Sequence, residues 1–125
     1  MDLMNYILIA LKVIVGISIL NVWLLQLNKP TRWRGGDAET IVDEFKVYGF
    51  SKNFCYLIGF LKVSLALILI ASIQLETLTL IGSLGLTVLL IGSIVMHIIV
   101  KDPLYKSFPA FLFIVMNVII AYSTL

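Results

Sequence analysis

Five polar residues lie inside long apolar stretches of this 125-residue chain: Lys12, Asn21, Lys62, His97 and Asn117. A polar side chain in hydrocarbon is costly, so such residues are candidates for function. The two lysines could bind an anionic or carbonyl-bearing ligand. His97 could donate to the same ligand or transfer a proton near neutral pH. We therefore predict a ligand-binding set made of these five residues.

The two lysines could also be accommodated in the membrane without a small-molecule ligand. No Asp or Glu lies in the apolar runs to pair with Lys12 or Lys62. Each could contact carboxylates of a partner protein, lose its charge through desolvation, or extend along lipid to a headgroup. His97 could instead hydrogen-bond across helices, as could Asn21 and Asn117.

Several kinds of catalytic site are excluded by residue counts. Cys55 is the one cysteine, so neither an internal disulfide nor a C-x-x-C pair can form. With one histidine there is no bis-histidine haem and no zinc motif of the HExxH type. No Ser-His-Asp arrangement and no glycine-rich phosphate loop can be argued from the sequence. A non-catalytic role is therefore favoured, with no metal and no nucleic acid as partner.

The polar residues must be positioned by membrane helices. Hydrophobic residues make up 61% of the chain and charged residues 13%, whereas soluble domains carry roughly 25% charged residues. Four apolar runs, at about 4–27, 54–73, 79–100 and 107–125, are each long enough to span a bilayer. We predict an all-α integral membrane protein with a single domain over 1–125. Its fold is a four-transmembrane-helix antiparallel bundle.

The loop after the first run is expected to contain a short amphipathic helix at about 38–48. Asp37 is its expected N-cap and Gly49 its expected C-terminal stop. Ile41, Phe45 and Tyr48 share one face, which we expect to rest at the headgroup boundary. Trp23 and Trp33 are predicted interfacial anchors beside it.

The charged residues predict an orientation. The loops after the first and third runs hold seven Lys or Arg residues, and the tails and the 74–78 turn hold none. The positive-inside rule therefore places both loops in the cytoplasm and both termini outside. The localisation predicted is a multi-pass protein of the cell (inner) membrane. The N-terminal run is expected to be retained as a helix.

Depths along the helices predict one polar track. At about 1.5 Å per residue, Lys12, Lys62 and Asn117 fall near the midplane, with Asn21 and His97 nearer the cytoplasm. Glycines and serines in 82–93 predict close helix packing, within the bundle or between protomers. We expect a homo-oligomer, because four helices leave little interior for two lysines.

Four stretches carry a family resemblance. They are NVWLLQLNKPT at 21–31, EFKVYGF at 44–50, YLIGFLK at 56–62, and MHIIVKDP at 96–103 leading into SFPA at 107–110. The chain resembles the DoxX-like family of small four-helix membrane proteins, to which an acetylcholine-receptor chaperone is distantly similar. Where that family places a glutamate after the glycine of its second helix, this chain has Lys62.

The resemblance implies two classes of function. The first is a non-catalytic binding or assembly module, whose intramembrane polar pocket takes a lipid-like ligand or the helices of another membrane protein. The second is a membrane subunit of a quinone-linked oxidoreductase, with a quinone as cofactor and Lys62 or His97 on its carbonyl. The size and helix count also fit a small proton-coupled transporter. However, this chain lacks the membrane-embedded glutamate that such coupling needs.

Overall fold

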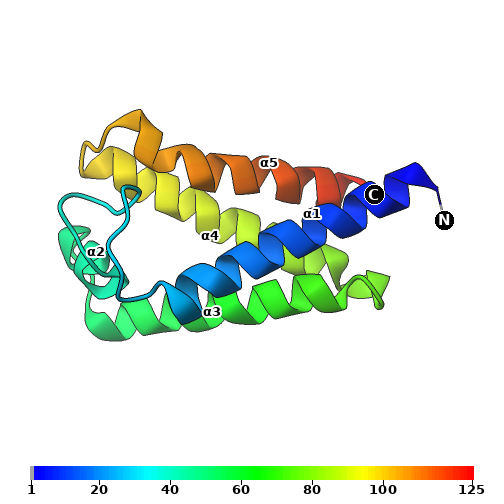
Figure 1. Ribbon diagram of the computed structural model, residues 1–125, viewed down its shortest axis with the longest axis horizontal. Helices are drawn as coiled ribbons and strands as arrows, with labels where there is room; N and C mark the ends of the chain where they lie inside the picture. The colour runs from blue at the N-terminus through cyan, green and yellow to red at the C-terminus, as the bar shows by residue number, and fades with distance from the viewer. Residues whose placement is uncertain (1) are drawn as a thin grey trace.

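Four long helices form an antiparallel bundle in the computed structural model, which describes residues 2–125 (Figure 1). Helix α1 (Leu3–Leu20) continues into a π-helical segment, η1 (Asn21–Leu25). It is followed by α3 (Lys52–Ala71), α4 (Thr79–Ile99) and α5 (Phe108–Tyr122), with short 3₁₀ turns η2 (Glu76–Leu78) and η3 (Leu104–Ser107) before the last two. Helices α1 and α4 each contact both α3 and α5, so neighbours around the bundle are antiparallel. This confirms the predicted fold class.

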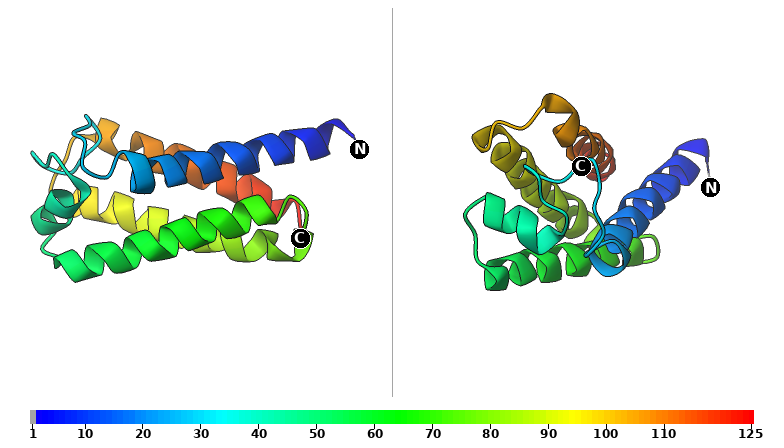
Figure 2. Two further views of the ribbon diagram at one scale, coloured as in Figure 1. Left: turned by 60° about the horizontal axis from the view of Figure 1, so that its bottom comes forward. Right: turned by 60° about the vertical axis from the view of Figure 1, so that its left-hand side comes forward.

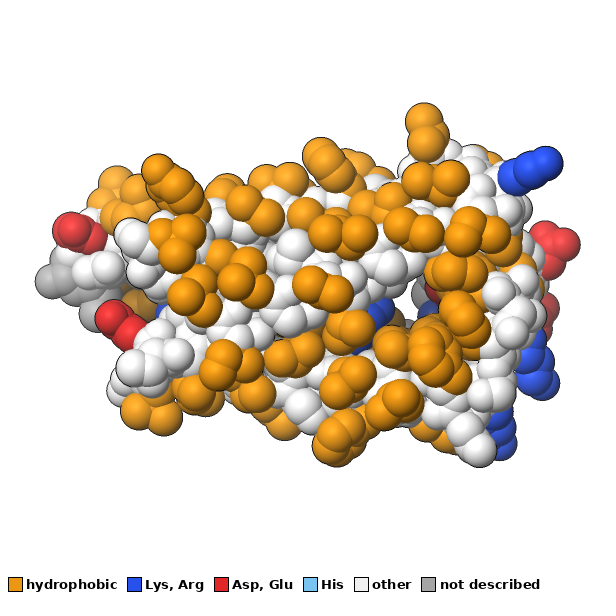
Figure 3. Space-filling model, turned by 180° about the vertical axis from the view of Figure 1, so that it is seen from behind, with side chains coloured by type: hydrophobic (Ala, Val, Ile, Leu, Met, Phe, Trp, Pro, Cys, Tyr) orange, Lys and Arg blue, Asp and Glu red, His pale blue; other side chains and the backbone are white. Residues whose placement is uncertain are grey.

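Four segments of the described chain are long and apolar enough to cross a membrane: Leu3–Leu25, Lys52–Ala71, Glu76–Ile99 and Leu104–Tyr122. Each lies within a few residues of a predicted run. Their outer surface is largely apolar, and most Lys and Arg side chains gather at one end (Figure 3). That surface suits hydrocarbon, and the charged end suits an aqueous boundary.

The two ends of the bundle are built differently. Both termini and the α3–α4 turn lie at one end, and the first turns of α1 extend beyond its neighbours there (Figure 1). The long loop, helix α2 (Ile41–Val47) and the η3 turn lie at the other end, which we call the loop end. Helix α2 lies across the loop end (Figure 2). All seven basic residues of the loops therefore share one side of the molecule.

Helix α2 begins later than predicted. Its N-cap is Thr40, whose Oγ1 accepts a hydrogen bond from the N–H of Asp43 at 3.1 Å, so Asp37 is not the cap. Gly49, at φ +90°, ends the helix as expected. The N–H of Gly49 bonds to the carbonyl of Lys46 and that of Phe50 to the carbonyl of Phe45, which is a Schellman motif.

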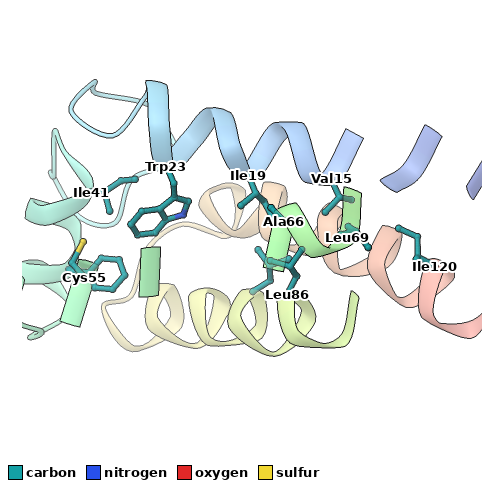
Figure 4. Packing of buried hydrophobic residues seen from close by; sticks show 11 residues of the cluster. Val15, Ile19, Trp23, Ile41, Cys55, Ala66, Leu69, Leu86 and Ile120 are labelled. Atoms are coloured by element: carbon teal, nitrogen blue, oxygen red, sulfur yellow. The ribbon is translucent and has the colours of Figure 1, made fainter. Parts of the chain in front are cut away.

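The core is a line of buried side chains along the bundle axis (Figure 4). Val15 and Ile19 from α1, Leu69 from α3, Leu86 from α4 and Ile120 from α5 are each at most 5% exposed. A Cβ on Gly82 would lie 3.0 Å from the backbone of Leu69, so this glycine lets α4 approach α3 closely. The small residues near Gly82 thus serve packing inside the bundle, and self-association stays a prediction.

Candidate functional site

Lys62 lies inside the bundle toward the loop end. Its side chain leaves α3, is 9% exposed, and donates from Nζ to Oγ of Ser93 on α4 at 3.2 Å. The same nitrogen lies 5.6 Å from the ring centroid of Trp23, which comes from the π-helical end of α1. A Cβ on Gly59 would lie 2.6 Å from the Trp23 ring, so the glycine one turn earlier lets the indole lie against α3. Three helices thus fix one amine next to an aromatic face.

Two adjacent cavities border this lysine, and six residues line both of them: Val22, Trp23, Arg34, Glu44, Lys62 and Ser93. The first, which we call the apolar chamber, has a volume of about 360 Å³. Its remaining lining is largely apolar: Ile41, Phe45, Tyr48, Phe50, Phe54, Ile58, Val88, Leu89, Gly92, Val95 and Met96. The second, the polar chamber, has a volume of about 440 Å³ and adds polar groups: Asn21, Gln26, Thr31, His97 and Lys106. Both volumes fall in the range of small-molecule sites.

The apolar chamber opens through the side of the bundle. Figure 3 shows a hollow in the apolar surface near the loop end, with basic side-chain atoms visible inside it. The basic residues that line the chamber are Lys62 and Arg34. Two of its apolar lining residues, Phe54 and Val88, are exposed on the outer surface of α3 and α4. A Cβ on Gly92 would meet nothing within 4 Å, so this glycine leaves the wall of α4 open. The opening faces the side on which lipid tails would lie.

Polar side chains form a connected network of hydrogen bonds and ion pairs at the loop end of the cavities. The Arg34 guanidinium, 6% exposed, donates to the carbonyls of Gln26 and Lys29 at 2.7 and 2.9 Å. Its Nη1 lies 3.7 Å from Oε2 of Glu44. The hydroxyl of Tyr48 donates to Oε1 of Glu44 at 2.8 Å. Burial, followed by the neighbouring Glu44 carboxylate, raises the pKa of Tyr48, so this hydroxyl keeps its proton.

The network of polar side chains extends from Tyr48 to a histidine–aspartate pair. Nδ1 of His97 lies 3.5 Å from the Tyr48 hydroxyl and 2.6 Å from Oδ2 of Asp102. Because Asp102 takes Nδ1, Nε2 is the ring nitrogen left to a ligand in the polar chamber, which His97 lines. In a neutral ring Nε2 would accept a hydrogen bond, and in a protonated ring it would donate one.

The backbone at the end of α4 brings Asp102 to His97. The N–H of Asp102 bonds to the carbonyl of His97 at 2.9 Å and that of Lys101 to the carbonyl of Ile98 at 3.0 Å. This is a second Schellman motif, but its left-handed position holds Lys101 at φ +61° where glycine is the usual residue. A non-glycine residue there costs about 1 kcal/mol. The strained turn folds the chain back so that the Asp102 carboxylate meets the imidazole on its own helix.

The carboxylate of Asp102 also fastens the long loop. Its Oδ1 accepts from the N–H of Gly36 at 3.0 Å, and Nζ of Lys106 donates to the carbonyl of Gly36 at 2.7 Å while lying 3.6 Å from Oδ1. Burial opposes the ionised form of Asp102. The hydrogen bonds from His97 and Gly36 and the charge of Lys106 outweigh it, and the pKa of Asp102 lies below its usual range.

The comparisons with known proteins identify a family. The model of the DoxX-like family matches residues 34–119, which include Arg34, Glu44, Lys62 and His97. The chain belongs to the DoxX-like family. Neither the curated proteins nor the solved structures include a significant match to it. Helix α1 and the segment η1, which supplies Trp23, lie outside the matched residues of this DoxX-like protein.

The predicted polar track is divided in this DoxX-like protein. Lys62, His97 and Asn21 line the polar chamber, but Lys12 borders neither chamber. Lys12 is 7% exposed and donates to the carbonyl of Ser72 and to Oγ1 of Thr79, both at 3.2 Å. Those residues flank the α3–α4 turn, at the end opposite the loop end. Counting depth from the start of α1 misplaced Lys12, because that helix begins beyond its neighbours.

The two asparagines of the DoxX-like protein do not make the expected bonds between helices within residues 2–125. Asn21 is exposed, and its Oδ1 accepts from Nε2 of Gln26 at 3.4 Å. Asn117 is fully buried and donates to the carbonyl of Phe113, one turn earlier in α5, at 2.8 Å. Its Oδ1 has no partner in the described part of the chain. Asn117 borders neither chamber.

Helix α2 packs differently from the expected interfacial helix. Ile41 and Phe45 are 3% and 9% exposed, and Trp23 is 8% exposed, so their apolar surfaces meet the bundle rather than headgroups. The rings of Phe45 and Trp23 meet edge to face with centroids 6.1 Å apart. Tyr48 is partly buried against His97. Helix α2 is therefore a cover over the chambers, while Trp33 stays partly exposed at the loop end.

Sequence reasoning missed the loop side chains that complete the site: Arg34, Glu44, Asp102 and Lys106. Arg34 and Lys106 entered only the charge count that predicts the orientation, and Glu44 and Asp102 were not among the candidate residues. Arg34 and Glu44 are ten residues apart, and Gly36 and Asp102 are 66 apart, so no helical or strand spacing links them. One local signal was available, since the residue before Pro103 leaves the helix and could fold back on His97. No group of three metal-ligating side chains occurs within the described residues.

Proposed function

We propose that this DoxX-like protein is a non-catalytic binding module that takes a lipid-like amphiphile from the bilayer. Its apolar part lies in the apolar chamber, and its hydrogen-bonding head meets Lys62 and the polar chamber. The observation that carries the proposal is the set of surroundings of Lys62: its burial, its single acceptor and the cavities beside it. An enclosed amine with one acceptor, Ser93, borders two cavities, and no carboxylate lies within 4 Å of it among residues 2–125.

The chemistry of Lys62 defines the head of the ligand. An amine donates hydrogen bonds whether or not it is protonated, and an ammonium has three donors. Ser93 accepts one of them. A carboxylate, phosphate or carbonyl oxygen in the chamber would accept another, and the low polarity of the surroundings would strengthen that bond. The helices of a partner protein presenting such an oxygen would meet the same requirement.

A blocking experiment tests the proposal. Gly92→Phe should fill the opening, whereas Gly92→Ala is the matched control because its Cβ meets nothing within 4 Å. Native mass spectrometry of gently extracted protein, with chemical identification of what is released, would measure stoichiometric bound material. We expect the bound amphiphile in the wild type and in Gly92→Ala, and its loss in Gly92→Phe. Equal occupancy in all three, or no bound molecule in the wild type, would contradict the proposal.

A quinone-linked oxidoreductase subunit is the second candidate. One observation favours it: His97, held by Asp102 at 2.6 Å, and Lys62 line the same chamber and could each meet a quinone carbonyl. The same experiment separates the two functions, since a released quinone supports the redox subunit and a phospholipid or fatty acid supports the binding module.

We also propose that the loop end faces the cytoplasm of a cell whose inner membrane holds the protein. The support is the gathering of all seven loop Lys and Arg residues at that end, with the termini opposite. Labelling of Thr124→Cys by an impermeant thiol reagent in intact cells tests it. We expect labelling in intact cells, because the proposed orientation puts Thr124 outside the cytoplasm. Labelling only after the membrane is opened would show the opposite orientation.

A further inference from the structure

A second apolar hollow lies on the outside of the loop end, separate from the opening of the apolar chamber. It is a groove of about 450 Å³ between the end of α4, the η3 turn and the start of α5. Its lining residues are Trp33, Ile94, Leu104, Tyr105, Ser107, Phe108 and Phe111. Leu104 is 86% exposed, and Phe108 and Phe111 are more than half exposed. A groove with such walls on a membrane helix is suited to hydrocarbon.

An arginine lies at the rim of this groove. The guanidinium carbon of Arg32 is 4.8 Å from the ring centroid of Trp33 and 5.6 Å from that of Tyr105. The two rings themselves meet edge to face at 6.1 Å. The guanidinium cation lies over both rings, and within the described residues no hydrogen bond occupies its N–H groups, which match the oxygens of a phosphate.

Unlike Arg34 and Lys106, Arg32 has no acidic partner among residues 2–125. Arg34 pairs with Glu44, and Lys106 lies beside Asp102. Arg32 makes no ion pair within 4 Å across residues 2–125 and is exposed. Its charge is therefore available to an anion at the level where headgroups would lie.

We propose that the groove and Arg32 form a binding site for one anionic phospholipid. An acyl chain lies along Ile94, Phe108 and Phe111, and the phosphate accepts hydrogen bonds from the Arg32 guanidinium. Trp33 and Tyr105 hold the guanidinium over the groove and provide the interfacial aromatic contact. Charge complementarity selects an anionic headgroup over a zwitterionic one, because a zwitterion brings its own cation beside the phosphate.

The chain contains a matched control. Lys52 at the loop end also lies over an aromatic ring, that of Tyr56 at 5.7 Å, but neither residue lines the groove. Arg32→Gln and Lys52→Gln each remove one positive charge from an exposed, ring-stacked side chain. They differ in whether that charge adjoins the groove.

Native mass spectrometry with added phosphatidylglycerol or phosphatidylcholine tests the site. We expect one phosphatidylglycerol bound in preference to phosphatidylcholine, and about fivefold weaker binding in Arg32→Gln, the loss expected for one basic residue at a lipid surface. Lys52→Gln should keep the wild-type preference. An equal loss in both variants would show a diffuse charge effect and overturn the proposal.

A further variant separates this site from the chambers. Gly92→Phe blocks the apolar chamber and leaves the groove intact, so it should keep the bound phosphatidylglycerol. If Gly92→Phe removes that lipid while Arg32→Gln retains it, the lipid lies in the chamber. The groove site is then overturned and the proposed function is supported.

Discussion

The two buried lysines lie at different levels of one bundle, Lys12 near the α3–α4 turn and Lys62 toward the loop end, and their surroundings differ. Lys12 donates to two protein acceptors, the carbonyl of Ser72 and the hydroxyl of Thr79, and borders neither chamber. Lys62 donates to one hydroxyl, that of Ser93, and borders both chambers. The exposed fractions of the two side chains are nearly equal, at 7% and 9%. Burial alone therefore does not distinguish the two lysines, whereas their hydrogen-bond partners and the space beside them do.

The same contrast holds for the backbone around each lysine. Lys12 ties α1 to the α3–α4 turn, where the C-cap residue Ser72 leaves a carbonyl that α3 cannot use. Lys62 lines its chambers together with residues of α2 and with Arg34, whose loop is fastened through Arg34 and Asp102. One end is closed by its own hydrogen bonds. The other end encloses space, and its polar groups hold the walls of that space in place.

Lys62→Met should have the largest effect, and on binding rather than folding. A hydrogen bond to a charged group is worth about 1.5–3 kcal/mol, so its loss should weaken binding of the co-purifying amphiphile by roughly tenfold or more and lower its occupancy. Methionine keeps the unbranched apolar stem. Inside the protein it loses only the bond to Ser93 and the contact of the amine with the Trp23 ring. Native mass spectrometry measures the occupancy. Lys12→Met is the control and should retain the ligand. Equal retention by both variants would remove the distinction between the lysines.

Lys12→Met should show the next largest effect, and on stability. The carbonyl of Ser72 and the hydroxyl of Thr79 lose their donor, and leaving buried acceptors unpaired costs about 1–3 kcal/mol. Thermal unfolding in detergent should therefore give a lower midpoint for Lys12→Met than for the wild type. Lys29→Met, at an exposed loop position, should change stability by less than about 0.5 kcal/mol. A midpoint that rises in Lys12→Met would mean that the cost of burying the amine exceeds the value of its bonds.

The contrast between the two lysines shows which features could be predicted from the sequence and which could not. The runs of apolar residues predict four helices and their antiparallel order, because length and hydropathy are local properties of a membrane span. Polar residues stand out in apolar runs, and three of those that do so, Lys62, His97 and Asn21, line the polar chamber. The separation of Lys12 from them was missed because it depends on where α1 starts relative to its neighbours, which no local pattern records.

The other features that the sequence did not predict, the packing of α2 and the contacts of Glu44 and Asp102, also depend on long-range contacts. Ile41 and Phe45 form an amphipathic face as predicted, but such a face fits a bundle as well as a headgroup layer, and the structure uses it against Trp23. Glu44 and Asp102 lie outside the apolar runs, so nothing in the sequence pattern marks them as candidates. Long-range contacts bring them to Arg34 and to Gly36. Side chains from loops complete the site, and loops carry the weakest signal for position.

The last prediction concerns acid, to which the loop end should respond through Asp102. The pKa of Asp102 is below its usual value in the folded protein. A carboxyl with a lowered pKa adds stability above its unfolded value of about 3.9, and that stability is lost as the pH falls through the folded value. Thermal midpoints in detergent should therefore fall below about pH 4 in the wild type.

Asp102→Asn removes this contribution and so tests its source. The variant should be less stable than the wild type at pH 7 by about 1–2 kcal/mol, because the amide cannot replace the charge beside Lys106 and the bond to His97 is weaker. The further loss of stability of Asp102→Asn between pH 5 and 3 should be smaller than that of the wild type. Asp37→Asn, at an exposed carboxylate in the long loop that Asp102 fastens, is the charge-matched control and should follow the wild-type curve. Parallel curves for Asp102→Asn and the wild type would place the acid response elsewhere, and the fastening of the loop through Asp102 would then contribute no pH dependence to the loop end.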